Sequence, residues 1–368
     1  MTAYNEDYSF GSLLQELIKA DGSDLHIRAG EPPFFRINGK LKRADMFPPL
    51  TQGKAKSLLY SIMSEERQQR FEEHLELDMS YTMPGIARFR VNVFQQQSCI
   101  GAAIRMIPFK IQTIDELKLP GVLKQLSLIP RGLILVTGPT GSGKSTTLAA
   151  MIDHINSNRK ANIVSIEDPI EFVHIDRLSV INQREVGVDA PSFAEALKHV
   201  MRQNPDVILV GEMRDLETMA SAITAAETGV IVFATLHTNN AVQTIDRIID
   251  VFPIEQQQQV RLQLAVTLQA IVSQTIVPKI NGEGRAVAFE IMIALPAIKA
   301  LVREGKAHQM YSIIQASGGY GMRTLDQDLV ELVKDDIVSY EEALARSPNP
   351  KEFEQRVLRV KPNVKIGG

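Results

Sequence analysis

The stretch LILVTGPTGSGKSTTLAA (residues 133–150) places an apolar run, a glycine-rich turn and a helix-forming run in succession. Within it, Gly138 and Gly143 bracket four residues, which lets backbone N–H groups turn inward and aims the positive end of the next helix at bound phosphates. Lys144 then reaches the terminal phosphates, and Ser145 can ligate Mg²⁺. A chance glycine-rich turn seldom carries Gly-Lys-Ser at this offset after a buried-type strand. The stretch therefore predicts a site for a nucleoside triphosphate in an α/β fold.

Length and composition indicate the number of domains, the kind of partner and the cellular compartment. Its 368 residues exceed one ordinary domain core, so two domains are expected. The 40 Lys and Arg against 43 Asp and Glu leave a net charge of −3, which gives no reason to expect a nucleic-acid partner. Cys99 is the only cysteine, which excludes an internal disulfide and a four-cysteine zinc module. Since no run approaches about 18 apolar residues and no basic leader opens the chain, a cytoplasmic protein without a membrane span is expected.

The first part of the chain predicts a mixed α+β domain that ends near residue 108. Leucines at 13, 14 and 17, with Ile18, indicate a short amphipathic helix with a glycine stop at Gly22. A second helix is expected over about residues 51–74. Strands are expected in DLHIRAG, in PPFFRINGKL with a turn at residues 38–39, and in ELDMSYTM, ARFRVNVFQQQ and CIGAAIRMI. Residues 108–120, between two prolines, are expected to form a hinge.

From residue 130 onward, strand and helix patterns alternate. Apolar runs in NIVSIED, SVINQ, DVILVGE and VIVFATLH are separated by helices expected from Ser192 and from Asp215. This rhythm predicts a parallel or mixed sheet with helices on both faces. The Gln256–Gln259 run falls in a helical pattern and is expected on the solvated surface, and a helix-rich region should follow residue 290.

Three further segments place polar side chains at predicted strand ends. DVILVGE ends in Glu212, SIEDPIEF offers Glu167 and Asp168 with Glu171, and TLHT places His237 after an apolar run. Each alone has an ordinary explanation as a loop residue, a helix cap or a structural histidine. Their occurrence in order at strand ends of one sheet, where open α/β sheets bind ligands, favours a common site.

The segments GPTGSGKST, SIEDPIEF, DVILVGEMRD and FATLHTNNA resemble the Walker A, Asp box, Walker B and His box of the secretion-superfamily hexameric ATPases. Within that superfamily the chain is similar to the type IV pilus retraction ATPases of twitching motility. The resemblance runs nearly end to end, through GSDLHI, RFRVNVF, NQREVG, RQNPD, DRIIDVFP and GMRTLDQ. It implies an N-terminal PAS-like α+β domain over residues 1–108, a linker over 109–120 and a C-terminal RecA-like P-loop ATPase domain over 121–368. It also implies a homohexamer that hydrolyses ATP with Mg²⁺.

The resemblance also implies the roles of individual residues. Glu167 and Glu212 become candidates for polarising the attacking water and holding the metal's water shell, and which of them is the base stays open. The metal would be held by Ser145 and Glu212, and His237 would sense the γ-phosphate or a neighbouring subunit. The nucleotide would be bound by residues of the phosphate loop and the start of its helix: Gly138, Thr140, Gly141, Ser142, Gly143, Lys144, Ser145 and Thr146.

Two arginines of the first domain match those that relatives bring to the nucleotide as arginine fingers. These are Arg90 in RFR and Arg105 in AIRMIP, on adjacent predicted strands. By residue type alone they would be ordinary surface arginines, and only the resemblance favours a catalytic role. The chain departs from the family at residues 228–230, where Val230 replaces the first histidine of the His box.

Two features of the sequence indicate whether such an ATPase assembles or retracts pili. Assembly ATPases commonly carry a tetracysteine zinc element and an extra N-terminal domain, which one cysteine and a compact first domain disfavour. The segment AIKALVRE (297–304) resembles the AIRNLIRE helix of retraction ATPases, with Ile298, Leu301 and Val302 spaced for one apolar face. Its long charged side chains, Lys299 and Arg303, are expected to face solvent.

These features predict retraction of type IV pili at the inner face of the cytoplasmic membrane. The expected partners are an inner-membrane platform protein of the pilus machine and a companion retraction ATPase. The alternatives are an accessory retraction ATPase and a pilus assembly or secretion ATPase. A RecA-like nucleic-acid motor would need interleaved basic and aromatic residues, which this chain lacks. A nucleotide switch that does not hydrolyse ATP would not need the full set of carboxylates and arginines.

Overall fold

The computed structural model describes residues 8–37, 39–83, 86–107 and 111–362. Its contacts divide the chain into two compact units, with the main boundary between residues 110 and 111. Each unit contains one sheet, so the prediction of a mixed α/β chain is confirmed. Asn38 of the predicted turn and residues 108–110 of the predicted hinge lie outside the described residues.

The N-terminal unit contains a six-stranded sheet in the order β3-β2-β1-β6-β5-β4, with every neighbouring pair antiparallel. Alternating side chains of its strands are buried, as in Phe89, Val91 and Val93, so one face of the sheet packs on the core. The alternation predicted the last three strands correctly. The strands are β1 (Gly22–Arg28), β2 (Phe34–Ile37), β3 (Lys40–Arg43), β4 (Glu76–Met83), β5 (Ala87–Gln96) and β6 (Cys99–Ile107).

Three helices complete the core of this unit: α1 (Phe10–Lys19), α2 (Gln52–Tyr60) and α3 (Glu65–His74). The prediction of one helix over residues 51–74 was wrong. The chain breaks after Ser61, and the side chain of Ser64 accepts the N–H of Arg67 and caps a new helix. The stop after α1 also differs, because the left-handed residue is Asp21 (φ 52°) rather than Gly22.

The C-terminal unit contains a seven-stranded sheet in the order β13-β12-β7-β11-β10-β8-β9. Its neighbours are parallel except for the β12–β13 pair, which confirms the predicted mixed sheet. The strands are β7 (Gly132–Thr137), β8 (Asn162–Glu167), β9 (Val180–Glu185), β10 (Val207–Val210), β11 (Ile231–Leu236), β12 (Leu268–Pro278) and β13 (Arg285–Ile293).

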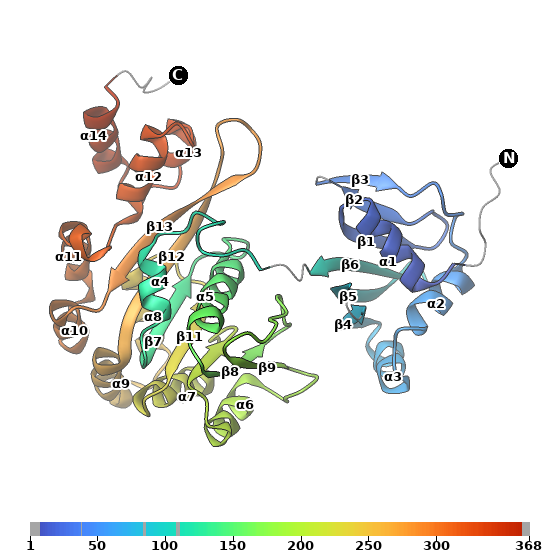
Figure 1. The fold of residues 1–368 in the computed structure, drawn as a ribbon, viewed down its shortest axis with the longest axis horizontal. Helices are drawn as coiled ribbons and strands as arrows, with labels where there is room; N and C mark the ends of the chain where they lie inside the picture. The colour runs from blue at the N-terminus through green and yellow to red at the C-terminus, as the bar shows by residue number, and fades with distance from the viewer. Residues whose placement is uncertain (1–7, 38, 84–85, 108–110, 363–368) are drawn as a thin grey trace. The chain divides into compact units, whose positions relative to one another are not determined.

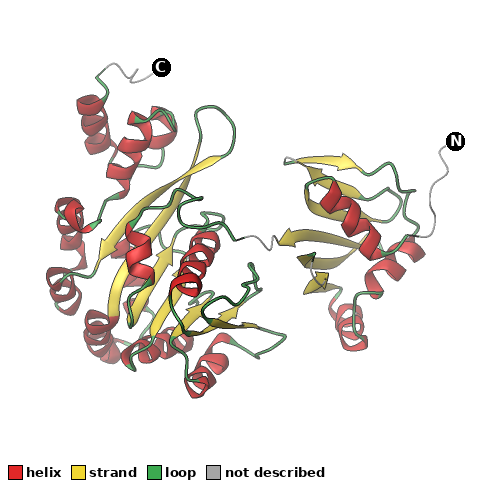
Figure 2. Ribbon diagram, in the orientation of Figure 1, coloured by secondary structure: helices red, strands yellow, loops and turns green. Residues whose placement is uncertain are grey.

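Helices cover both faces of this sheet (Figure 2). Ile134 and Val136 of β7 pack with α4 (Val122–Ser127) and α5 (Lys144–Asn158) on one face. Leu133 and Leu135 pack on the other face, in a core built with α6 (Phe193–Val200), α7 (Leu216–Glu227), α8 (Ala241–Asp250), α9 (Ile254–Thr267), α10 (Pro296–Arg303) and α11 (Met310–Ala316). Short 3-10 turns complete the chain at Met201–Gln203, Ala307–Gln309 and Gly318–Tyr320.

The last three helices gather near the far end of the β12–β13 ribbon (Figure 1). Leu329, Val338 and Phe353 are buried there against Val277 and Ala288 of the ribbon. This confirms the predicted helix-rich region. The helices are α12 (Leu325–Lys334), α13 (Tyr340–Leu344) and α14 (Pro350–Val360).

Helix α10 corrects one expectation about its charged side chains. Ile298 and Val302 are buried as predicted, Leu301 is partly buried against the same core, and Arg303 is exposed. Lys299 is not free in solvent: its Nζ donates a hydrogen bond to the carbonyl oxygen of Val266 at 3.2 Å, and partial burial lowers its pKa. The stem of this lysine lies on α9, a contact that helical spacing alone does not reveal.

The glutamine run and the segment 111–120 were also the subject of predictions. The glutamines at 256, 258 and 259 are exposed on α9, as predicted. Residues 111–120 have no helix or strand, yet Ile114 is buried in the core of the C-terminal unit. Of the helices in the described ranges, none combines the length and apolarity needed to cross a membrane.

Candidate active site

The sheet of the C-terminal unit brings four sequence segments to one edge. Strands β7, β11, β10 and β8 are consecutive neighbours and all run parallel. Leu135, Ala234, Val210 and Ile166 stand at one level across them. The phosphate loop, His237, Glu212 and Glu167 therefore all follow at the carboxyl ends of adjacent strands, which is where open α/β sheets bind ligands.

The phosphate loop contains three glycines with positive φ, and two of them, Gly138 and Gly143, stand at its ends. Gly138 has φ 141°, and a Cβ there would lie 2.4 Å from the carbonyl oxygen of Gln274. Gly143 has φ 90° and stands immediately before α5, whose first residues are Lys144 and Ser145. Only glycine adopts these angles at little cost, so the loop can fold back over the start of the helix and aim its N–H groups at an anion.

The side chains of the loop fit a phosphate ligand. Lys144 is 8 % exposed, and its Nζ donates hydrogen bonds to the carbonyl oxygens of Gly138 at 2.8 Å and Pro139 at 3.1 Å. Ser142 is buried, and within the described part of the chain its Oγ has no hydrogen-bond partner. A buried hydroxyl and a buried ammonium beside a glycine-rich helix start are groups that phosphate oxygens would satisfy.

Glu212 lies two residues beyond β10 and is held by two basic side chains. Its Oε1 is 3.0 Å from Nε2 of His237, and its Oε2 is 2.7 Å from a terminal guanidinium nitrogen of Arg214. Burial alone would raise the pKa of Glu212, but the hydrogen bond from Arg214 and the charges of His237, Arg214 and Lys144 bring it below the usual value. Glu212 is therefore an ionised carboxylate near the phosphate loop, suited to a cation.

Glu167, the last residue of β8, has different partners. Its Oε1 accepts hydrogen bonds from Ser165 Oγ at 2.6 Å and from Gln183 Nε2 at 3.1 Å. Gly211 donates its N–H to the carbonyl oxygen of Ile166, and a Cβ on Gly211 would lie 3.2 Å from the Cα of Glu167. This close approach of β10 to β8 places the backbone of Glu167 beside the residue that precedes Glu212.

His237 begins the loop between β11 and α8, and its side chain is 43 % exposed. The structure therefore brings His237 and Glu212 together, as the shared strand ends predicted. Val230, which replaces the family histidine, lies before β11 and is buried in the apolar core. The two positions sit at opposite ends of β11, so Val230 is not part of the cluster around Glu212.

Three residues of the site were not among the predicted site residues. Arg214 pairs with Glu212, and Gln183 of β9 holds Glu167. Gln274 of β12 donates from Nε2 to Thr147 Oγ1 at 2.9 Å, directly under the phosphate loop. Arg214 and Gln183 lie in the segments DVILVGEMRD and NQREVG, so the family resemblance could have drawn attention to them.

The two predicted arginine fingers lie on the N-terminal unit. Arg90 of β5 and Arg105 of β6 are exposed register partners, on the sheet face opposite the buried core residues. Arg105 Nε donates to Asp24 Oδ1 at 2.9 Å, and Arg36 also lies near that carboxylate. Burial alone would raise the pKa of Asp24, but the Ser23 hydroxyl, Arg105 and then Arg36 bring it below its usual value. The structure thus holds Arg105 extended across the sheet surface.

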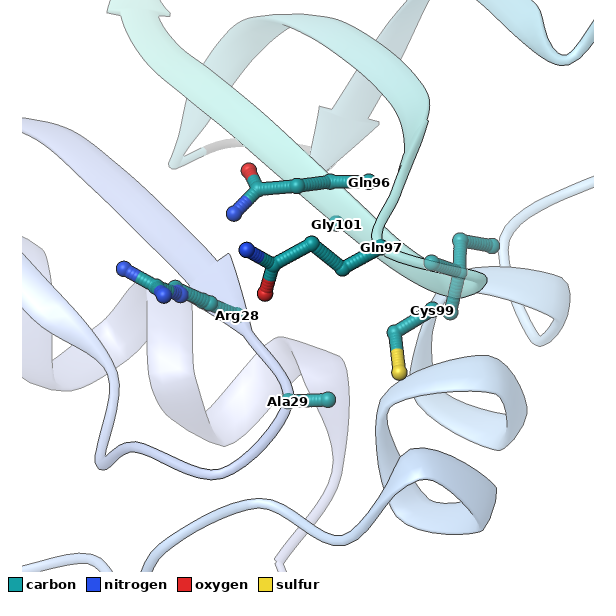
Figure 3. A pocket seen from close by; sticks show the side chains of 7 residues that line it. Arg28, Ala29, Gln96, Gln97, Cys99 and Gly101 are labelled. Atoms are coloured by element: carbon teal, nitrogen blue, oxygen red, sulfur yellow. The ribbon is translucent and has the colours of Figure 1, made fainter.

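A small cavity of about 60 Å³ lies in the N-terminal unit, between Arg28 and the β5–β6 turn. Figure 3 shows the carboxamides of Gln96 and Gln97 extending side by side toward the region of Arg28. This volume is several times smaller than a pocket that encloses a nucleotide-sized ligand. It is therefore not a second nucleotide site.

The residues also bear on the metal. No group of three or more His, Cys, Asp or Glu side chains gathers to hold a metal anywhere in the ranges 8–37, 39–83, 86–107 and 111–362. Mg²⁺ needs no such cage, because it keeps several waters and is held through a hydroxyl, one or two carboxylates and substrate phosphates. Ser145 at the start of α5 and the ionised Glu212 are groups of that kind.

A glycine-rich loop between β7 and α5, with carboxylates at the ends of neighbouring parallel strands, defines a P-loop nucleoside triphosphatase fold. The chain belongs to the Type II/IV secretion system protein family, whose model matches residues 6–325.

Individual relatives are similar over nearly the whole chain. A Pseudomonas aeruginosa protein named "Type IV pilus retractation ATPase PilT" is 51 % identical over 93 % of this chain and 98 % of its own. The P. aeruginosa protein "Type IV pilus ATPase PilU" is 41 % identical over 94 % of this chain and 90 % of its own. A solved structure, "Crystal Structure of the Pilus Retraction Motor PilT and Bound ADP", superposes with a TM-score of 0.89 at 48 % identity, covering 95 % of this chain and 100 % of that one.

Proposed function

We propose that this protein is an ATP-hydrolysing motor that powers the retraction of type IV pili in twitching motility. The observation that carries the proposal is the joint placement of the phosphate loop, Glu167, Glu212 and His237 at adjacent strand ends of one parallel sheet. The end-to-end similarity to a relative named for pilus retraction supports the biological role. An accessory retraction ATPase is the second candidate, and the lower identity of the relative named "Type IV pilus ATPase PilU" makes this candidate the weaker one.

The mechanism follows from the residues. ATP phosphates are bound by the backbone N–H groups of residues 140–146 and by Lys144, which exchanges its bonds to Gly138 and Pro139 for phosphate oxygens. Mg²⁺, held by Ser145 and through Glu212, would neutralise charge on the β- and γ-phosphates. His237, with Nε2 at 3.0 Å from Oε1 of Glu212, then lies where it can respond to the γ-phosphate.

We assign the polarising base to Glu167 and the metal role to Glu212. Both oxygens of Glu212 face basic side chains, and the bond from Arg214 with the nearby charges brings the pKa of Glu212 below its usual value, which makes it a poor proton acceptor and a good metal ligand. The Ser165 hydroxyl and the Gln183 carboxamide both donate to Oε1 of Glu167, and such bonds orient a carboxylate. Hydrolysis needs such a group to orient water, since phosphoryl transfer depends on positioning and charge compensation.

The domain assignment and the assembly belong to the same proposal. Residues 1–108 form a PAS-like domain, and residues 121–368 form a RecA-like ATPase domain. Residues 109–120 are the linker, and Ile114 of this linker packs on the C-terminal core. Six copies form a ring, and Arg90 and Arg105 act as arginine fingers. The protein works in the cytoplasm at the inner face of the cytoplasmic membrane, against a platform protein of the pilus machine and beside a companion retraction ATPase.

The function is tested in a strain that lacks its own retraction ATPase. The chain is expected to restore surface motility and sensitivity to pilus-dependent phage, and the purified protein to hydrolyse ATP with Mg²⁺. Restoration only when another retraction ATPase is present would support the accessory role instead. ATP turnover without any effect on pili would overturn the retraction function.

Alanine at Arg90 or at Arg105 is expected to lower the turnover of the assembled ring by about tenfold or more, because each guanidinium is proposed to stabilise phosphate charge in the transition state. Arg36→Ala is the matched control: Arg36 also pairs with Asp24 and shares the sheet face, so its loss should leave turnover unchanged. Equal turnover per subunit in all three variants would show that Arg90 and Arg105 are ordinary surface arginines.

Arg303→Ala should separate hydrolysis from mechanical output. Arg303 is exposed in the last turn of α10, so its removal should change the free energy of unfolding by no more than about 0.5 kcal/mol. ATP turnover is expected to stay within about threefold while pilus retraction stops, measured as purified ATPase rate beside surface motility. Leu301→Asp, which puts a charge against the core, is the control that should damage folding. Normal motility of Arg303→Ala would show that α10 serves packing alone.

A further inference from the structure

A buried polar row crosses the sheet at the level where the phosphate loop begins. Thr137 of β7, Ser273 of β12 and Glu290 of β13 are successive register partners. They are 0 %, 2 % and 4 % exposed, and the hydroxyl oxygens of Thr137 and Ser273 lie 2.8 Å apart. The neighbours on the same face, Leu135, Ile271 and Met292, are apolar. A buried carboxylate among apolar residues calls for a specific reason.

Glu290 joins the first residues of two helices that are far apart in the sequence. Its Oε1 accepts the N–H of Ala241, the first residue of α8, at 2.8 Å, and the N–H of Leu325, the first residue of α12, also stabilises the carboxylate. Burial raises the pKa of Glu290 to about 6, the N–H groups of Ala241 and Leu325 oppose this rise, and the charge of Asp326 adds to it. The positive ends of two helices are a favourable place for a negative charge.

One of these helices carries the loop of His237. Between β11 and α8 lie only residues 237–240. This loop is fixed to α8, because Thr238 Oγ1 lies 2.7 Å from Thr244 Oγ1 and Asn240 caps the helix by accepting the N–H of Gln243. The distance of 3.0 Å between His237 and Glu212 therefore depends on where α8 begins, and Glu290 holds that point.

The other helix begins in GMRTLDQ (residues 321–327), a segment without a role so far. Arg323 exchanges two backbone hydrogen bonds with Ile291, the neighbour of Glu290 on β13, at 2.9 and 3.1 Å. Thr324 then caps α12, and the next N–H, of Leu325, meets Glu290. The segment is thus fastened to β13 at Ile291 and at Glu290.

We propose that Glu290 is a positioning residue for hydrolysis: its carboxylate fastens α8 to β13 and to α12, and so holds His237 against Glu212. The proposal rests on the ATP hydrolysis proposed above. A carboxylate suits the position because it offers two acceptor oxygens to two N–H donors from different helices. Glutamine has the same shape but a single acceptor oxygen, so its amide group would face one N–H with another donor.

The test is a double-mutant cycle with Glu290→Gln and His237→Ala, measured as kcat and KM for ATP in the assembled protein. Glu290→Gln alone is expected to lower kcat by about tenfold and to leave KM within about threefold, since the phosphate loop is untouched. In the His237→Ala background the same change should alter kcat by less than about twofold. Where Glu290→Gln does not fold, Glu290→Asp, which keeps two acceptor oxygens on a shorter arm, takes its place.

Asp328→Asn is the matched control. Asp328 is also a buried carboxylate, accepts the N–H of Phe289 at 2.8 Å and pairs with Arg323, and among the described residues it makes no hydrogen bond to α8. It is expected to lower the melting temperature and to leave kcat within about twofold. Amide hydrogen exchange of residues 237–241 should rise in Glu290→Gln and not in Asp328→Asn, a readout that does not need turnover.

Two outcomes overturn the role of Glu290: equal loss of kcat with and without His237, or unchanged kcat in the Glu290 variant. Absence of ATP turnover by the wild-type ring would instead overturn the proposed function, with the exchange experiment still deciding whether Glu290 fastens α8.

Discussion

Replacing Lys144 with alanine is expected to lower ATP turnover by about 10³-fold. The ammonium lies between the carbonyl oxygens of Gly138 and Pro139, at the mouth of the loop that would receive the β- and γ-phosphates. Without it, negative charge that develops on those phosphates loses its nearest protein cation. The fold should persist, because the loop geometry depends on Gly138 and Gly143 rather than on this side chain.

The measurement is phosphate release by the purified variant under saturating ATP, with thermal unfolding to confirm the fold. Lys160→Ala is the matched control, because Lys160 is an exposed lysine just beyond the opposite end of α5. It removes the same charge and should leave turnover unchanged. Normal steady-state turnover of Lys144→Ala would exclude the phosphate loop as the hydrolytic site.

Glu212→Gln is expected to lower kcat by about 10²- to 10³-fold while ADP binding is retained. The amide keeps the shape of the side chain but removes its negative charge. Arg214 and His237 lie against this charge, and the metal ion needs it for binding. The variant should therefore also need more Mg²⁺ for half-maximal turnover. Glu167→Gln should lower kcat without changing this Mg²⁺ dependence, since Glu167 is proposed to orient water.

Both variants are compared by ATPase titration with Mg²⁺ and by binding of a fluorescent ADP analogue. Glu217→Gln is the control, because Glu217 is an exposed carboxylate of α7 that pairs with Lys198 of α6. A shifted Mg²⁺ dependence in Glu167→Gln, with none in Glu212→Gln, would exchange the two roles. Loss of ADP binding in both would indicate that they serve the fold.

The parts of the structure that local pattern decides could be predicted from the sequence. A glycine-rich turn between a buried strand and a helix has few alternatives, so β7, the phosphate loop and α5 were correctly placed. Strand alternation likewise located β4, β5 and β6, because a one-residue slip would turn Phe89 and Val91 out of the core. Adjacent parallel strands also brought Glu212 and His237 together, as their positions at strand ends indicated.

Features that depend on distant contacts could not be predicted. Ser64 fits a helix surface as well as a helix cap, and only the packing of α2 and α3 decides that it ends one helix and begins another. Lys299 has helical spacing for solvent, but the end of α9 offers it the carbonyl of Val266. Glu290 lies in a strand without any motif, and its partners come from segments about 50 residues before and 35 after it. The catalytic roles of the site residues stay predictions.

The equal level of Leu135, Ala234, Val210 and Ile166 has a consequence for the active site. Each reactive group is attached to a different strand, so a slip of one residue would displace a group by about 3.3 Å and turn it to the other face. Hydrolysis therefore requires that the whole sheet is intact. A molecule with a damaged sheet would therefore stop hydrolysing ATP, instead of consuming ATP without producing movement.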